Sequence, residues 1–414
     1  MKRRSVLFLM IAVLLLFAVG CAAGPAKTEE PNSSSSSMSV PSESESSAPP
    51  AETEERPEEP EGSASEESDA SSSGQSAVPA GPATTQELFA EGYPEAQELL
   101  ENMTLEEKVA QVFLFRCPSE NALAAVQTYQ PGGFMLFAKD FDGKTAEQVC
   151  AEMESYQQAS KIPMFLAVDE EGGTVVRVSR NANLAPKPFQ SPQQVFQSGG
   201  MQAIVDDTVQ KTQLLQSLGL NVNLVPVADV STNPPTSCMR GRSARGGGNG
   251  RLLKNSVATY NQQRMACALK HFPGYGNNED THTGIAVDHR PYETFMESDF
   301  LPFAAGIEEG APMVLVSHNI VNCMDSEHPA SLSPEVHRVL REDLGFTGLI
   351  LTDDLSMGAI GIYRRKAPVR RRSTRATTCC YLRLQADYNA LLAAVQDGTV
   401  TEERWTNRCC GFWR

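Results

Sequence analysis

The segment KHFPGYGNNEDTHTG, residues 270–284, gathers side chains that can move protons or carry charge. It contains His271 and His282, although the whole chain has only six histidines. Asp280 stands two residues before His282, so its carboxylate can hold one ring nitrogen and leave the other to exchange a proton. A general acid/base is one interpretation of this segment, and a solvated surface loop is the other.

Two further stretches place acids directly after apolar runs. VDEEGGTVVRV contains Asp169 and Arg177, which suit sugar hydroxyls, although an ordinary turn with a surface ion pair also fits. LTDDLSMGAI contains Asp353 and Asp354. Adjacent strand residues point opposite ways, so at most one of this pair faces a shared site, as nucleophile or cation stabiliser. The other can cap the next helix, as Asp often does.

Seven short apolar runs must position these side chains, and helix-like stretches separate most of them. The runs span residues 112–115, 132–137, 163–169, 221–230, 266–272, 312–318 and 348–354. This alternation predicts a parallel sheet covered on both faces by helices. Polar residues end six runs and would meet at the mouth of a (β/α)8 barrel, although seven strands are one too few. A doubly wound sheet would normally show a Gly-rich phosphate loop, which is missing here.

The motifs DEEGG-x-V-x-R, KHFPG-x-G followed by D-x-H, and TDDLSM together resemble glycoside hydrolase family 3, in its single-domain β-N-acetylhexosaminidase branch. The similarity runs from about Leu100 to Tyr363 and again over YNALLAAVQDGTVTEER. It implies a TIM-type barrel and a retaining, two-step mechanism, with a histidine in place of the usual carboxylic acid. It also implies a terminal β-linked N-acetylglucosamine substrate, as in cell-wall fragments, and no metal or organic cofactor.

The resemblance assigns roles by position. Asp353 would be the nucleophile that forms a glycosyl-enzyme intermediate, His282 the general acid/base, and Asp280 the partner that orients His282. The implied sugar-contacting residues are Asp169, Arg177, Arg242, Lys270 and His271. The chain departs from the family at Tyr275, where His is usual, at Glu170, where Gln is usual, and at Gly241-Arg242-Ser243-Ala244, where Asp- or Glu-Arg-Ser-Phe is usual.

Two other functions remain open. A family 3 β-glucosidase usually carries a second α/β domain that supplies the acid/base, for which this chain has no room, and the D-x-H loop also argues against it. A sugar-binding lipoprotein that has lost catalysis belongs to a different class. All three implied catalytic positions are filled, which favours the enzyme.

Three windows break the family pattern: residues 245–253, 364–386 and 405–414. A nucleotide string that can encode RRRSTRATTCCYL, read two bases later, gives AAVNAGNDMLLS, which resembles the family's eighth-strand segment. We therefore predict that frameshifts have corrupted the last-strand region and that the chain as written is weakly active or inactive. A genuine divergent tail is the alternative, and resequencing the gene distinguishes the two.

The N-terminus is typical of an exported lipoprotein. Basic residues 2–4 precede an apolar run over 6–19, and FAVGC resembles a lipobox. Residues 1–20 are therefore predicted to be a signal peptide, with lipid on Cys21 holding the protein at the outer face of the cell membrane. An ordinary signal peptide with an incidental cysteine is the alternative.

Residues 21–85 are rich in Ser, Glu and Pro and are predicted to be a disordered tether. Thirteen acidic and two basic residues lie between 25 and 85, so most of the net charge of -16 is local. The remainder is mildly acidic, and no nucleic-acid partner is expected, because phosphate binding needs clustered Lys and Arg. The barrel domain is predicted over 86–414 and starts with a helical pattern in which Thr104 and Glu107 form a capping box. The ten cysteines show no zinc-type spacing, so no metal site is predicted.

Overall fold

The computed structural model describes residues 92–230, 246–276, 284–366, 379–380 and 384–401, all within one unit, Gly74–Arg414. The strands are β1 (Phe113–Arg116), β2 (Gly133–Leu136), β3 (Phe165–Val168), β4 (Val222–Asn223), β5 (Ala266–Phe272), β6 (Val287–Asp288), β7 (Met313–Val316), β8 (Ile320–Val321), β9 (Leu349–Thr352) and β10 (Cys379–Cys380). The α-helices are α2 (Tyr93–Asn102), α3 (Leu105–Gln111), α4 (Ala122–Tyr129), α5 (Ala146–Ala159), α6 (Pro192–Ser217), α7 (Gly246–Gln262), α8 (Tyr292–Thr294), α9 (Phe300–Glu308), α10 (Pro334–Arg338), α11 (Gly358–Lys366) and α12 (Leu384–Gln396).

Eight strands form one parallel sheet in the hydrogen-bonded order β10-β1-β2-β3-β4-β5-β7-β9. Each of the seven predicted apolar runs contributes a strand to it, so the predicted α/β alternation is confirmed. The two end strands, β9 and β10, come within 8 Å of each other between Cα atoms, so the sheet curls in the manner of a TIM barrel wall. Strands β6 and β8 pair separately.

The eighth strand, which the apolar runs did not predict, is very short. β10 has two residues and pairs in parallel with Phe113 and Leu114 of β1. It lies inside the window 364–386 that we interpret as frameshifted, and that interpretation stays a prediction. A two-residue strand forms few ladder hydrogen bonds, and among the described residues the hydrogen-bonded order ends at β9 and β10.

Strand residues alternate between two cores. Inside the curl lie Leu114, Met135, Ala167, Val222, Leu224, Ala268, Met313, Leu315, Leu349 and Leu351. Their strand neighbours, such as Phe115, Val314 and Ile350, pack outward against the helices. Side chains of a strand point to opposite faces in turn, so this alternation also decides which residues beyond the strand ends face the interior.

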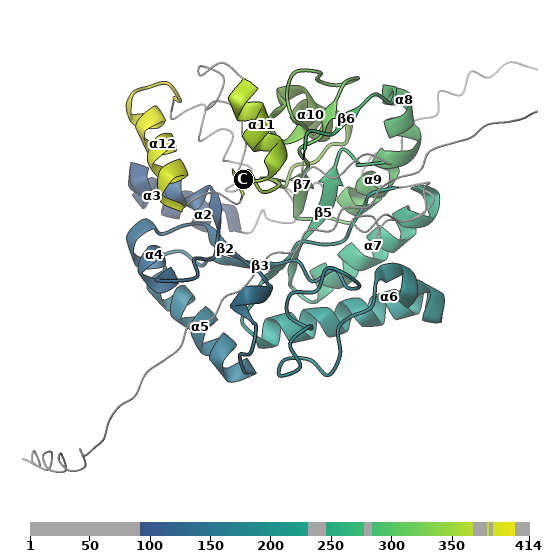
Figure 1. Ribbon diagram of the computed structural model, residues 1–414, viewed down its shortest axis with the longest axis horizontal. Helices are drawn as coiled ribbons and strands as arrows, with labels where there is room; N and C mark the ends of the chain where they lie inside the picture. Colours follow the sequence, from purple (N-terminus) through teal and green to yellow (C-terminus); the bar gives the residue numbers. More distant parts are fainter. Residues whose placement is uncertain (1–91, 231–245, 277–283, 367–378, 381–383, 402–414) are drawn as a thin grey trace, which may run out of the picture. The chain divides into compact units, whose positions relative to one another are not determined.

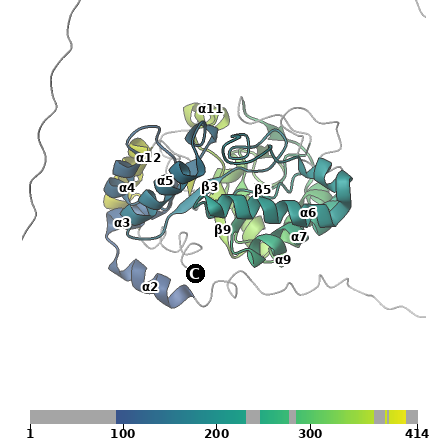
Figure 2. The same cartoon turned by 90° about the horizontal axis from the view of Figure 1, so that it is seen from below.

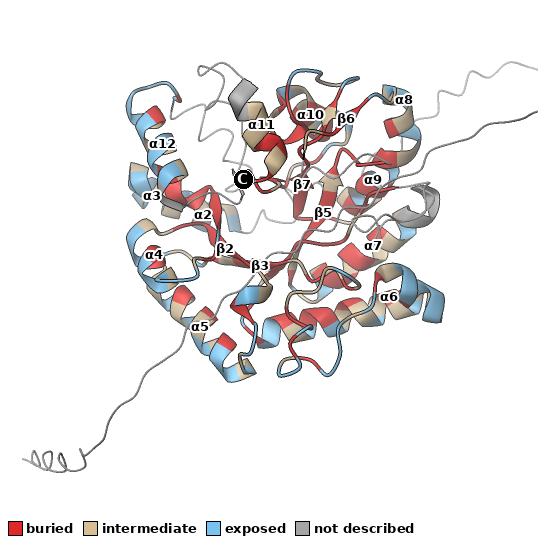
Figure 3. Ribbon diagram, viewed as in Figure 1, coloured by how far each residue is buried: buried red, intermediate tan, exposed pale blue. Residues whose placement is uncertain are grey.

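Helices cover the outer face of the sheet (Figure 1). Helix α7 packs between α6 and α9, and the three lie side by side in Figure 2. Their buried residues face the sheet and their exposed residues face outward (Figure 3). The predicted capping box is present, because Thr104 accepts from the Glu107 amide and the Glu107 carboxylate accepts from the Thr104 amide at the start of α3. Within the described ranges, the helices are too short or too polar to cross a membrane.

Candidate active site

The inner positions at the carboxyl ends of the strands carry charge. Arg116 follows Leu114 by two residues, Asp169 follows Ala167, Lys270 follows Ala268, and Asp353 follows Leu351. Since each inner residue is followed two positions later by another on the same face, these four side chains belong to one layer above the apolar interior. The layer lies at the barrel mouth, where the sequence predicted the chemistry.

Lys270 joins two of the predicted strand ends. Its Nζ lies 2.6 Å from Oδ1 of Asp169 and 2.7 Å from Oε1 of Glu171, and only 3% of its side chain is exposed. Burial alone would lower the pKa of Lys270, but the charges of Asp169 and Glu171 outweigh it and raise that pKa. Lys270 is therefore a permanent cation that holds both carboxylates in place.

The loop after β3 is built around the buried carboxylate of Glu170. It accepts from the backbone amides of Arg177 and Val178 at 2.8 Å and from Ser179, while the Glu170 amide donates to Asn223 on β4. Glu170 thus braces the segment from Asp169 to Arg177. Arg177 is partly exposed, with a buried Nε that has no protein partner within the described part of the chain.

The turn in this loop requires glycine. Gly172 has a φ of +98°, and a Cβ there would lie 2.1 Å from the Gln190 carbonyl oxygen. The glycine at this turn is therefore explained by both backbone conformation and a close approach of two chain segments.

His271 is oriented by an acid that the motifs did not single out as a site residue. Its Nδ1 lies 2.8 Å from Oδ2 of Asp229, which is fully buried and whose Oδ1 accepts from the Tyr275 amide at 2.9 Å. The Tyr275 ring stands edge-on to the imidazole, with ring centroids 5.3 Å apart. Asp229 therefore fixes the histidine ring and the start of the loop that continues toward the predicted acid/base His282.

Asp353 and Asp354 divide their roles as the alternation predicts. Asp353 is partly exposed, and its amide donates to the Val316 carbonyl on β7 at 2.8 Å. Asp354 is buried, and its Oδ1 accepts from the amide and hydroxyl of Ser356 at 2.8 and 2.7 Å just before α11. One acid therefore lies in the mouth layer and the other organises the turn into the helix.

Arg116 is a charged residue of this layer that sequence reasoning missed. Its Nε donates to Oδ2 of Asp354 at 2.8 Å, and its guanidinium carbon lies 4.8 Å from the ring centre of Phe137. A single Arg after an apolar run belongs to no motif, so only the period-two spacing from Leu114 could have pointed to it.

Several predicted residues lie outside the described ranges: the acid/base His282, its partner Asp280, the sugar-contacting Arg242 and the lipidation site Cys21. Among the residues that the structure does describe, no group of three or more His, Cys, Asp or Glu side chains is placed to hold a metal ion.

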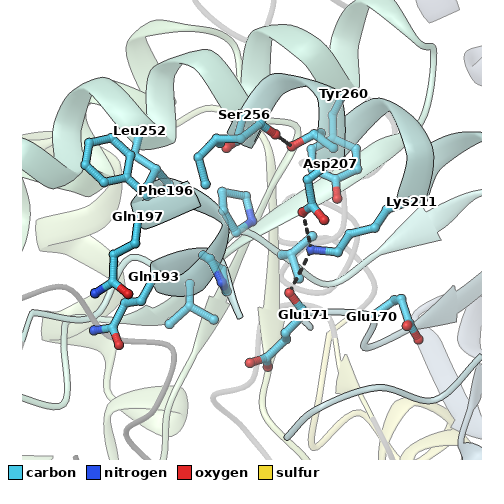
Figure 4. Close-up of a pocket in the computed structure, with 16 residues that line it drawn as sticks. Glu170, Glu171, Gln193, Phe196, Gln197, Asp207, Lys211, Leu252, Ser256 and Tyr260 are labelled. Atoms are coloured by element: carbon cyan, nitrogen blue, oxygen red, sulfur yellow. Dashed lines mark hydrogen bonds and ion pairs between the residues drawn. The ribbon is translucent and has the colours of Figure 1, made fainter. Parts of the chain in front are cut away.

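A separate pocket of about 380 Å³ opens between α6, α7 and the segment after β4 (Figure 4). Lys211 on α6 pairs there with Asp207 at 2.6 Å and donates to the Glu171 carbonyl at 2.9 Å. Glu171 also lines this pocket, while its carboxylate reaches Lys270. Glu171 thus connects this pocket with the charged layer around Lys270.

We expect Lys270→Met to lower the free energy of unfolding by about 3 kcal/mol at pH 7, because Asp169 and Glu171 would stay confined without their cation. Lowering the pH should recover part of that loss. The two repelling carboxylates would bind protons more readily in the folded than in the unfolded state, which adds stability as pH falls. Urea unfolding at pH 7 and pH 5 measures both effects.

Lys254→Met is the matched control. Its side chain is 45% exposed and lies 3.3 Å from Glu308, so its loss should change the unfolding free energy by less than about 0.5 kcal/mol. Equal losses for the two lysines would contradict the account of Lys270.

The sequence of this chain is similar to those of known proteins. Residues 104–410 match the N-terminal domain of glycosyl hydrolase family 3. Beta-hexosaminidase A of Pseudoalteromonas piscicida is 30% identical over 259 residues, which cover 57% of this chain and 42% of that protein, so the match spans less than half of that relative.

Solved structures agree in fold. A glycoside hydrolase family 3 beta-N-acetylglucosaminidase from Paenibacillus sp. str. FPU-7 superposes with a TM-score of 0.65 at 25% identity, covering 75% of this chain and 61% of the other. A beta-glucoside phosphorylase reaches 0.66 at 21% identity, covering 78% and 60%, which is a likeness of fold alone. The chain therefore belongs to glycoside hydrolase family 3 and carries its TIM-like N-terminal domain.

Proposed function

We propose that this protein is a retaining β-N-acetylhexosaminidase that removes terminal β-linked N-acetylglucosamine from cell-wall-type glycans. The observation that carries the proposal is the position of Asp353. It stands two residues beyond Leu351 in the inner layer, at the carboxyl end of β9, where a barrel enzyme holds its reacting groups. The names of the relatives support the sugar: one is a beta-hexosaminidase and one a beta-N-acetylglucosaminidase.

In the first step, a carboxylate oxygen of Asp353 attacks the anomeric carbon. The bond from that carbon to the leaving oxygen breaks, and His282 gives its proton to that oxygen, so the aglycone departs as an alcohol. An ester between Asp353 and the sugar remains.

In the second step, neutral His282 takes a proton from water as the water oxygen attacks the anomeric carbon. The ester bond breaks, the Asp353 carboxylate is restored, and the sugar leaves with its β configuration retained. Asp280 orients the imidazole through both steps. Each proton and bond is accounted for without a cofactor.

Asp169 and Lys270 supply the sugar-binding side of the mouth. Asp169 is held by Lys270 at 2.6 Å and can accept from hydroxyls of the sugar. Because the two are already paired, little side-chain entropy is lost when the sugar binds. Arg177, Arg242 and His271 complete the proposed set of sugar contacts.

Trapping the intermediate tests the proposal, and it suits an enzyme that turns over slowly. With a 5-fluoro derivative of N-acetylglucosaminyl fluoride as substrate, the ester between Asp353 and the sugar forms fast and is hydrolysed slowly. We expect mass spectrometry to find one added sugar on the peptide that contains Asp353, and none in Asp353→Asn. Label on a residue other than Asp353 would contradict the proposed nucleophile.

We also propose that the protein is exported and anchored by lipid on Cys21. We expect cells that express the full chain with a labelled fatty acid to yield labelled protein in the membrane fraction. The Cys21→Ser variant should be unlabelled and should leave that fraction after a salt wash, because one lipidated end supplies most of the membrane affinity. An equally labelled variant would refute the anchor.

A further inference from the structure

Arg116 and Asp354 link β1 and β9 across β10, which has only two residues. Arg116 ends β1, and Asp354 lies two residues after β9; both strands neighbour the two-residue β10. The ion pair therefore ties together two sides of the mouth where, among the described residues, the hydrogen-bonded strand order ends at β9 and β10. The residues are 238 positions apart in sequence.

The guanidinium of Arg116 is fixed from two directions. Its Nε and Nη2 both donate to Oδ2 of Asp354, with the Nε contact at 2.8 Å, and the Phe137 ring lies 4.8 Å from its central carbon. The side chain of Arg116 is 50% exposed, whereas that of Asp354 is only 8% exposed. A charge-assisted bond to a buried acid holds its geometry better than an exposed ion pair does.

Asp354 in turn holds Asp353 through its own backbone. The Asp354 amide donates to Oδ1 of Asp353 at 2.8 Å, and its carbonyl accepts from Nε2 of His318 at 2.9 Å. His318 is fully buried and is held at Nδ1 by Ser331. The orientation of the Asp353 carboxylate therefore depends on the position of the Asp354 backbone, whose amide donates to Asp353 and whose carbonyl is held by His318.

We propose that Arg116 is a positioning residue for the nucleophile. It clamps the Asp354 side chain, so that the Asp354 amide keeps the Asp353 carboxylate aligned for attack on the anomeric carbon. This inference rests on the proposed glycosidase function. It assigns Arg116 an effect on the rate of ester formation and little effect on sugar binding, because Arg116 acts through Asp354.

The test compares trapping kinetics in Arg116→Met, Arg116→Lys and the control Arg338→Met. Arg338 is 41% exposed and bonds to Glu335 and Glu342 on the outside of the barrel. The 5-fluoro N-acetylglucosaminyl fluoride is the probe, and each protein's labelling is normalised to its folded fraction. The rate constant of labelling and the dissociation constant of the probe are measured separately.

We expect Arg116→Met to lower the labelling rate constant about 10- to 100-fold, since misplacing a reacting group by about 1 Å costs this much. The dissociation constant should change less than about threefold. Arg116→Lys should recover part of the rate, and Arg338→Met should match the parent chain. A further variant, Arg116→Ala, should label slowly by itself. Added methylguanidinium should raise its labelling rate constant, which a purely structural role would not predict.

A double-mutant cycle checks that the effect passes through Asp354. If it does, Arg116→Met combined with Asp354→Asn should lose no more rate than the worse single variant. Normal labelling of Arg116→Met, or fully multiplicative losses in the double variant, would overturn the positioning role alone. A parent chain that takes its label on a residue other than Asp353 would overturn the proposed function, and this inference with it.

Discussion

The alternation of side chains along parallel strands is the constraint on which the site depends. Leu349 and Leu351 pack inside the curled sheet, so Asp353 follows them into the mouth while Asp354 turns away. The same parity brings Asp169 and Lys270 to the mouth from β3 and β5. A register shift of one residue in any of these strands would exchange a mouth residue for a buried one.

Charge at the mouth is balanced by pairs that join different strands. Lys270 neutralises Asp169 and Glu171, and the mouth residue Arg116 pairs with Asp354, the buried acid of the turn into α11. These cations let several acids lie close together without strong mutual repulsion. Because each pair spans two strand ends, the ion pairs also set the spacing of the groups that would contact a sugar.

Apolar runs made the seven main strands predictable, because fully buried parallel strands are continuously apolar. The 2.6 Å contact between Lys270 and Asp169 could not be predicted from the sequence, because it joins residues 101 positions apart and depends on how the sheet curls. Local sequence conflicts with structure at the start of α7, where Gly246, Gly247 and Gly248 each disfavour helix by about 1 kcal/mol relative to Ala. These glycines lie in the window 245–253, which we interpret as frameshifted. The short β10 lies in another such window, 364–386.

The most direct test is a crystal structure of the trapped glycosyl-enzyme. We expect electron density that joins the anomeric carbon to a carboxylate oxygen of Asp353, with sugar hydroxyls on Asp169 and the His282 imidazole on the opposite side of that carbon. A sugar bound only in the pocket between α6 and α7, or His282 on a different face of the molecule from Asp353, would contradict it.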